Sequence, residues 1–172
     1  MRRSIVIALF VVAALAGMRI AGSSATVAAD PDNKNEILKN SVLTDLDGEV
    51  VTLAQFAGKT VLIDIWETWC TPCLRSMPTL QKLMDDYPDD FVVLAVSPGY
   101  MDTPEQVREF VANHDYTFEF VFGEDLARDL NVQSIPFKVY VGPDGQYIES
   151  VLGTQGPDRD YEKAREIIHR FQ

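Results

Sequence analysis

The sequence predicts an α/β fold in which a central mixed sheet is flanked by helices. Two apolar runs rich in β-branched residues, 61–65 and 91–97, have the composition of buried strands. Apolar residues recur at helical spacing after each run, and such alternation is typical of a sheet covered on both faces. Turn signals at 47–48 (Asp-Gly) and 143–145 (Pro-Asp-Gly) lie between apolar stretches. We therefore expect one β-hairpin near the start of the domain and another near its end.

The individual elements follow from these patterns in chain order. The leading hairpin should span 42–53, and the first buried strand, VLIDI, should be followed by a helix from about Cys70 to Asp86. The residues Thr103-Pro104-Glu105-Gln106 indicate a capped helix start, with Thr as N-cap, Pro first and Gln third. The remaining expected elements are a strand at 118–122, a helix at 124–130, strands at 137–141 and 147–152, and a final helix at 158–171.

The chain of 172 residues is long enough for one domain with a sizeable core, which we expect at 41–172. The segment 30–40 is polar, and we expect it to form a loose lead-in. The formal net charge is -11, so the chain lacks the basic surface that nucleic-acid binding requires. We expect a monomer that binds no nucleic acid.

The first 29 residues have the composition of an export signal. Arg2 and Arg3 precede an uninterrupted apolar or small run at 5–18, and small residues then end at Val27-Ala28-Ala29. This order of segments predicts a signal peptide that is cleaved after Ala29. The run is short for a full membrane span of about 20 residues, but an extension to Ile20 past Arg19 leaves an uncleaved membrane anchor as the alternative. Either outcome places the domain outside the cytoplasm.

The chain contains two cysteines, Cys70 and Cys73, in the stretch WETWCTPC. A haem attachment site would need His at the next position, which is Leu. A zinc site needs about four ligands, whereas the two histidines, His114 and His169, lie far along the chain and are expected on the surface. A structural disulfide stabilises by closing a long loop, and this pair closes almost none. No metal site and no cofactor are therefore predicted, although a copper-carrying role stays open.

Dithiol–disulfide exchange fits the pair better. Cys70 is expected where the strand ends and the helix begins, and the free N–H groups of a helix start stabilise a thiolate and lower its pKa. Cys73 lies one turn further on, within reach of a disulfide with Cys70. Cys70 would attack a substrate disulfide, and Cys73 would then resolve the mixed disulfide. Pro72 suits the first helical turn, because that turn leaves N–H groups unpaired.

The residues VLIDIWETWCTPC at 61–73 resemble the active-site region of thioredoxins. Ser134-Ile135-Pro136 matches the cis-proline loop of that family. The leading hairpin and the inserted segment between Ser97 and Phe122 make the chain similar to the exported TlpA/ResA-like thioredoxins. The resemblance spans 42–172, and it implies a thioredoxin fold and thiol:disulfide oxidoreductase activity.

The resemblance also implies roles for further residues. Pro136 would be cis, would face the cysteine pair and would offer backbone groups to an extended substrate. Asp64, an acid inside an apolar strand, should have a raised pKa and would take and return the proton of Cys73. The alternative is that Asp64 is only a hydrogen-bonded strand residue. Substrate contacts are expected from Trp69, Thr71, Pro72, Ile135 and Pro136, and Trp66 is expected in the core.

The chain departs from the family pattern at three positions. Ser76 stands where ResA-like proteins usually carry an acid three residues after the second cysteine, and Asp64 would replace that acid. Phe137 follows the proline where Thr is usual, so its ring would narrow the groove or add an apolar contact. Glu67 occupies a position that is usually small, and we expect its side chain to point to solvent.

These features together predict an exported thiol:disulfide oxidoreductase that acts as a reductant. The resemblance implies protein disulfide substrates, with cytochrome c precursors before haem attachment as the leading class, and a membrane protein as the thiol electron donor. Ile135 before the proline is similar to the reducing members. A disulfide oxidase or isomerase is the second interpretation, and a metallochaperone or binding module on a thioredoxin scaffold is the third.

Overall fold

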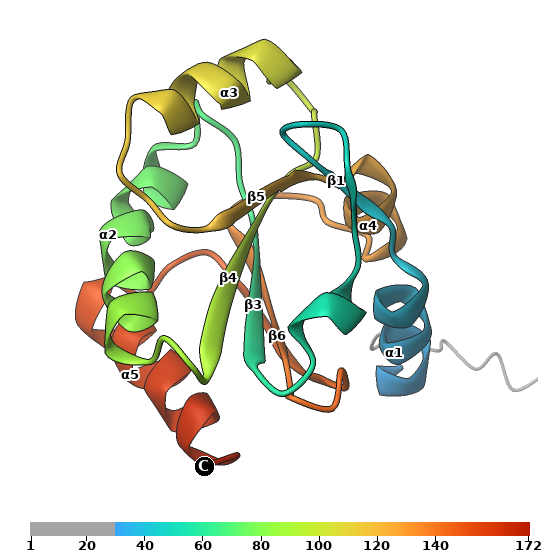
Figure 1. Cartoon of the computed structure of the whole chain (residues 1–172), viewed down its shortest axis with the longest axis vertical. Coiled ribbons are helices and arrows are strands. Elements are labelled where there is room, and N and C mark those ends of the chain that lie inside the picture. Colours follow the sequence, from blue (N-terminus) through green and yellow to red (C-terminus); the bar gives the residue numbers. More distant parts are fainter. Residues whose placement is uncertain (1–29) are drawn as a thin grey trace, which may run out of the picture.

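The computed structural model describes residues 30–172 of the chain, and one mixed sheet runs through them (Figure 1). Its strands are β1 (Leu43–Asp45), β2 (Val50–Val51), β3 (Thr60–Ile65), β4 (Phe91–Ser97), β5 (Glu119–Phe122), β6 (Phe137–Val141) and β7 (Tyr147–Leu152). They lie in the order β2-β1-β5-β4-β3-β6-β7. β4 is parallel to β3 and β5, and the other pairs are antiparallel. The mixed sheet and its two hairpins are thus confirmed.

The helices cover both faces of this sheet (Figure 1). Helices α2, α3 and α5 contribute to the core on one face, whereas α1 and α4 contribute to the core on the other. The helices of the described residues are α1 (Pro31–Asn40), α2 (Thr71–Asp86), α3 (Pro104–Ala112), α4 (Glu124–Asp129) and α5 (Pro157–His169), with a short 3₁₀ helix at Leu53–Phe56.

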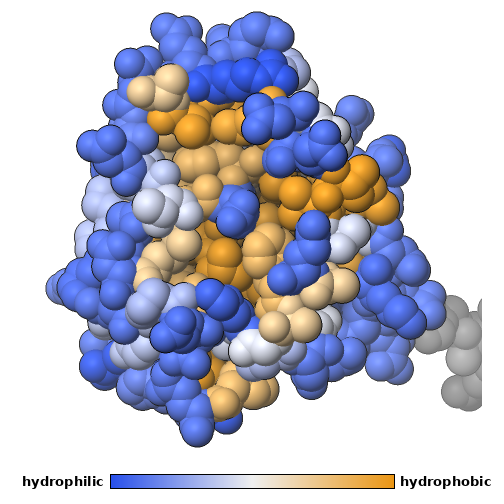
Figure 2. All heavy atoms as spheres, viewed as in Figure 1, coloured by the Kyte–Doolittle hydropathy of each residue, from blue (hydrophilic) through white to orange (hydrophobic). Residues whose placement is uncertain are grey.

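The apolar run of β3 supplies both cores, because successive residues of a strand point to opposite faces. Leu62 and Trp66 pack on the side of α2, α3 and α5, together with the two cysteines. Ile63 and Ile65 pack on the side of α1 and α4. In a space-filling view, apolar residues gather in the middle of the molecule between two polar flanks (Figure 2), as expected for a sheet held between helix layers.

The start of α3 has the predicted capping arrangement. The Thr103 hydroxyl accepts the Gln106 N–H at 3.4 Å, and Gln106 Oε1 accepts the Thr103 N–H at 2.8 Å. Both bonds satisfy N–H groups that a helix start leaves without helical partners. The loop that leads into α3 is therefore fixed at its end, and it contacts Glu67 and Thr68, which precede Cys70.

The segment 30–40 forms α1 and not the loose lead-in expected from its polarity. The Asp30 side chain caps the helix by accepting the Asp32 N–H at 3.2 Å. Leu38 is fully buried in the core on this face. Lys34 Nζ donates to Tyr147 Oη at 2.8 Å and to Ser150 Oγ at 3.1 Å, which ties the helix to β7.

The predicted signal peptide or anchor, residues 1–29, lies outside the described residues. Among the helices of residues 30–172, none combines the length and the apolar character needed to cross a membrane.

Candidate active site

The cysteines lie at the junction between β3 and α2, as the sequence predicted. Trp66 continues β3 by donating its N–H to Val96 O at 3.1 Å, and the chain then turns into the helix. Cys70 is the N-cap of α2, and its Sγ accepts the Cys73 N–H at 3.3 Å. The sulfur thus takes one of the free N–H groups of the helix start, the environment that favours a thiolate in the reduced protein.

The structure joins Cys70 and Cys73 in a disulfide, with a Cα–Cα distance of 5.2 Å. Cys70 is 2% exposed and Cys73 is 0% exposed. Of the two, Cys70 is therefore the residue that a thiol or disulfide partner can reach from solvent. This asymmetry fits the order of events expected from the sequence, with Cys70 reacting first and Cys73 second.

The cis-proline loop lies next to this junction. The peptide bond between Ile135 and Pro136 is cis. Ile65 at the end of β3 pairs with Phe137 at the start of β6. Pro136 directly precedes Phe137, so it lies near the end of β3. The Pro136 carbonyl already accepts the Gly153 N–H at 2.7 Å. Within residues 30–172 the backbone groups of Ile135 have no hydrogen-bond partner, so Ile135 is better placed than Pro136 to pair with a substrate strand.

Asp64 is buried inside the sheet and forms an ion pair that the sequence did not reveal. It lies opposite Lys138 in the antiparallel pair of β3 and β6. Lys138 Nζ is 3.1 Å from Asp64 Oδ1, and the two side chains are 3% and 1% exposed. Burial raises the pKa of Asp64 above its ordinary value. Lys138 lowers it, but by less than burial raises it. Asp64 shares its side of β3 with Leu62 and Trp66, which is also the side of the cysteines.

Glu67 does not point to solvent, contrary to our expectation. It is fully buried, and its carboxylate accepts the Trp69 Nε1–H at 2.5 Å and the Met101 N–H at 3.0 Å. A buried carboxylate needs such donors, because burial without them is costly. Trp69 is a close neighbour in the sequence, but Met101 belongs to a loop 34 positions along the chain, and the local sequence gave no sign of that donor.

The other predicted substrate contacts surround the disulfide at different depths. Trp69 and Thr71 are exposed, Pro72 and Ile135 are half-buried, and Pro136 is buried. Trp66 is fully buried, as expected. Two residues that depart from the family pattern are part of the structure around the site. Ser76 is buried and donates its hydroxyl to Cys73 O at 2.8 Å. Phe137 is half-buried and is the first residue of β6.

The histidines lie on the surface, as predicted. His114 Nδ1 is bonded to Phe110 O, and His169 Nε2 is bonded to Tyr87 Oη. Residues 30–172 contain no group of three or more His, Cys, Asp or Glu side chains that could hold a metal ion.

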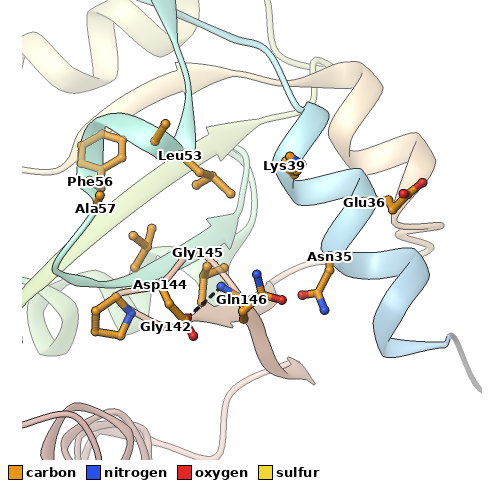
Figure 3. A pocket seen from close by; sticks show the side chains of 14 residues that line it. Asn35, Glu36, Lys39, Leu53, Phe56, Ala57, Gly142, Asp144, Gly145 and Gln146 are labelled. Carbon is orange, nitrogen blue, oxygen red and sulfur yellow. Dashed lines mark hydrogen bonds between the residues drawn. The ribbon is translucent and has the colours of Figure 1, made fainter.

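A cavity of about 520 Å³ lies at the opposite end of β3 from the disulfide (Figure 3). Val61 at the start of β3 lines it, whereas the cysteines follow the end of this strand. Leu53 and Phe56 form its apolar part, and Asn35 and Gln146 contribute polar groups. None of the predicted site residues lines this cavity, so the disulfide chemistry does not use it.

Comparisons with known proteins agree with this site. The model of the Redoxin family matches residues 22–164. Thiol-disulfide oxidoreductase ResA of Bacillus thuringiensis subsp. konkukian is 30% identical over 142 residues, which are 79% of this chain and 81% of that protein. Thioredoxin-like protein YneN of Bacillus subtilis is 35% identical over 114 residues, 65% of this chain and 67% of that protein. The exposed lipoprotein thioredoxin of Streptococcus pneumoniae has the same fold, with a TM-score of 0.62 at 24% identity over 73% of this chain and 97% of that one.

The fold and the disulfide at the start of α2 define a thiol-disulfide oxidoreductase of the thioredoxin-like class. The chain belongs to the Redoxin family, and the resemblance to TlpA/ResA-like thioredoxins is confirmed.

Proposed function

We propose that this protein is an extracytoplasmic reductant of protein disulfides. The observation that carries the proposal is the disulfide between Cys70 and Cys73 at the start of α2, on the side of the sheet that also holds Asp64. The order of basic, apolar and small segments in residues 1–29 supports a location outside the cytoplasm.

The reaction follows from the arrangement of the two sulfurs. In the reduced protein, Cys70 Sγ attacks one sulfur of the substrate disulfide and displaces the other as a thiolate, which gives a mixed disulfide. Cys73 Sγ then attacks Cys70 Sγ and displaces the second substrate sulfur. Two electrons and two protons pass to the substrate, and the protein is left with the disulfide seen in the structure.

Asp64 is the proposed acceptor of the Cys73 proton. Burial raises its pKa, so Asp64 is a stronger base than an exposed carboxylate and is suited to take this proton and to return it when the protein is reduced again. Lys138 stabilises the ionised form of Asp64 and so opposes the effect of burial.

The proposed substrates are cytochrome c precursors with a disulfide that has to be opened before haem attachment, and the proposed electron donor is a membrane thiol protein. Both follow from the resemblance to TlpA/ResA-like thioredoxins. A reductant of this kind needs a low reduction potential, because electrons must flow from its thiols to the substrate.

Insulin reduction by dithiothreitol tests the activity. The wild-type domain should accelerate it, and Cys70→Ser should not. Equal activity of both proteins would refute the assignment. The reduction potential of the Cys70–Cys73 pair then tests the direction. A value near that of thioredoxin, about -270 mV, supports a reductant, whereas a value near about -120 mV would make the protein a disulfide donor.

A further inference from the structure

Lys138 lies between two carboxylates that belong to the neighbouring strands. β6, which carries Lys138, is the strand between β3 and β7. Asp64 lies directly opposite Lys138 on β3, and Val151 lies directly opposite it on β7. Glu149 is two positions from Val151, so it points to the same face of the sheet and is a diagonal neighbour of Lys138. Because diagonal neighbours are within reach of long side chains, Lys138 can extend toward either carboxylate.

The structure shows Lys138 paired with the first of these carboxylates. Its Nζ lies 3.1 Å from Asp64 Oδ1, and Lys138 is 2% exposed. A proton on Asp64 removes the negative charge from this pair and leaves the ammonium group of Lys138 buried without an anion. Such a charge is costly, because neither water nor an opposite charge stabilises it. Lys138 therefore needs a second carboxylate whenever Asp64 is protonated.

Glu149 has an oxygen atom that can accept the ammonium group. Lys163 Nζ on α5 lies 3.0 Å from Glu149 Oε2 and 2.7 Å from Oε1, and only the contact with Oε2 has the geometry of a hydrogen bond. Oε1 is buried and has no hydrogen-bond partner within residues 30–172. The side chain of Lys163 is 35% exposed, so it can turn to solvent when another cation approaches Glu149. The loss of a partly exposed ion pair costs little free energy.

The other ionisable groups near the pair are less suitable partners. Asp160 on α5 is buried, but its oxygens already accept the Thr154 hydroxyl and, at 2.9 Å, the Gln155 N–H. Tyr140 lies directly opposite Glu149 and is buried. Burial raises the pKa of Tyr140, and the charges of the three carboxylates raise it further, so its hydroxyl stays uncharged. The cysteines of α2 carry no charge in the disulfide. Glu149 is therefore the available anion.

We propose that Lys138 changes its ion-pair partner from Asp64 to Glu149 while Asp64 carries the proton of the resolving thiol. Glu149 is then a positioning residue for the resolving step. The inference rests on the proposed function, in which one proton moves from Cys73 Sγ to a carboxylate oxygen of Asp64. Lys138 keeps its own proton and charge throughout, and the exchange transfers no electrons. The ion pair seen in the structure is the arrangement for ionised Asp64, and the exchange leaves no buried charge unpaired when that carboxylate becomes neutral.

A crystal structure of the oxidised Asp64→Asn protein tests the exchange directly, because the amide is uncharged, like a protonated carboxyl group. Lys138 Nζ should lie about 3 Å from a carboxylate oxygen of Glu149, and Lys163 should point to solvent. A Lys138 side chain that stays beside position 64, or that turns to Asp160, would overturn the proposal.

NMR titration of the side-chain carboxyl carbons keeps the proposal testable if Asp64→Asn does not fold, since Asp64 is then retained. The oxidised protein is used, so that the cysteines do not titrate. Glu149→Gln should lower the pKa of Asp64, because the protonated state loses its alternative anion. Glu166→Gln is the matched control, since Glu166 pairs with Arg170 on α5 and its side chain is 63% exposed, and it should leave this pKa unchanged. No shift in Glu149→Gln, or an equal shift in both variants, contradicts the exchange.

Lys138→Met separates the exchange from a direct effect of charge. In this background Glu149→Gln should no longer change the pKa of Asp64, because the side chain that changes partners is absent. An undiminished shift would mean that Glu149 acts on Asp64 through space and that no exchange occurs.

Kinetics then connect the exchange to the reaction. Glu149→Gln should slow the resolution of the mixed disulfide about 3-fold at neutral pH, a small part of the usual effect of a general base, and Glu166→Gln should behave as wild type. An unchanged rate in Glu149→Gln would remove its positioning role. If Cys70→Ser reduces insulin as fast as wild type, the proposed function fails, whichever partner Lys138 takes. If Lys138 stays at position 64 while Cys70→Ser is inactive, only the exchange fails.

Discussion

Lys138 Nζ lies 3.1 Å from Asp64 Oδ1, and both side chains are almost completely buried between two antiparallel strands. The pair places a proton-binding group on the side of β3 that carries the cysteines. The pKa of Asp64 is raised mainly by burial, and Lys138 opposes that rise. One carboxyl group is therefore expected to affect both the chemistry of Cys73 and the stability of the fold.

Asp64→Asn should slow the resolution of the mixed disulfide, because Cys73 loses its proposed proton acceptor. The expected loss is on the order of 100-fold at neutral pH, within the usual range for general base catalysis. Stopped-flow mixing of the reduced protein with a fluorescent peptide disulfide measures this step. The wild-type rate should rise with pH through the raised pKa of Asp64, whereas Asp64→Asn should lack that inflection and Asp64→Glu should regain part of it. An unchanged pH profile in Asp64→Asn would make Asp64 a structural residue only.

Lys138→Met should destabilise the fold at neutral pH, because it leaves the Asp64 carboxylate buried without its cation. The expected loss is about 3–5 kcal/mol at pH 7, measured by urea unfolding. The folded state holds the Asp64 proton more tightly than the unfolded chain, so the contribution of Asp64 to stability is full below pH 3.8 and is lost as the pH rises through the folded-state pKa. The loss in Lys138→Met should therefore shrink as the pH falls.

Two comparisons make this stability prediction specific. The double variant Asp64→Leu, Lys138→Met should be at least as stable as wild type, since replacing a buried ion pair by apolar residues is often neutral or stabilising. Lys163→Met removes the partner of Glu149 in a pair whose side chains are 35% and 29% exposed, and it should cost less than about 1 kcal/mol. An equal loss in Lys163→Met and Lys138→Met would contradict the account.

The two cysteines should differ in the adducts they form. Cys73→Ser keeps the more accessible Cys70, so it should accumulate a stable mixed disulfide with a peptide disulfide. Cys70→Ser should form little adduct, because Cys73 is 0% exposed. Intact-protein mass spectrometry after acid quenching gives the adduct fraction of each variant. More adduct in Cys70→Ser than in Cys73→Ser would reverse the assigned roles.

Helix α1 should contribute to the stability of the domain. Leu38→Ala should lower the free energy of unfolding by about 2–4 kcal/mol, because Leu38 is fully buried in the core under α1. Leu152→Ala makes the same chemical change at a side chain that is 63% exposed, and it should cost less than about 0.5 kcal/mol. Similar losses in chemical denaturation would mean that α1 packs only weakly on the sheet.

The elements that could be predicted are those determined by residues close together in the sequence. β4, β6 and β7 begin and end where the apolar runs and the Pro143-Asp144-Gly145 turn placed them. Helix α1 was missed because Ile37 and Leu38 are the only large apolar residues in 30–40, and its stability comes from contacts with β7 and the core.

The parts of the site that escaped prediction depend on distant segments. The partner of Asp64 became evident only once the register of β3 and β6 placed Lys138 opposite it. Glu67 was assigned to solvent because the N–H group of Met101 that it binds belongs to a loop brought near by the fold. A charged residue within an otherwise apolar strand, as in FKVYV, is the one local sign that a buried partner was needed.

The loop that carries Met101 and the segment that carries the cysteines are separate parts of the chain that meet at Glu67. The exposed surface of the loop and the sulfur chemistry can therefore change independently in evolution. The sulfur chemistry belongs to the junction of β3 and α2, whereas the exposed Tyr100 and Met101 belong to the connection between β4 and α3. Replacements at Tyr100 and Met101 change an exposed surface without altering a reacting atom. The surface beside the dithiol can thus change while the dithiol stays the same, and in this chain Glu67 keeps the neighbouring loop in place.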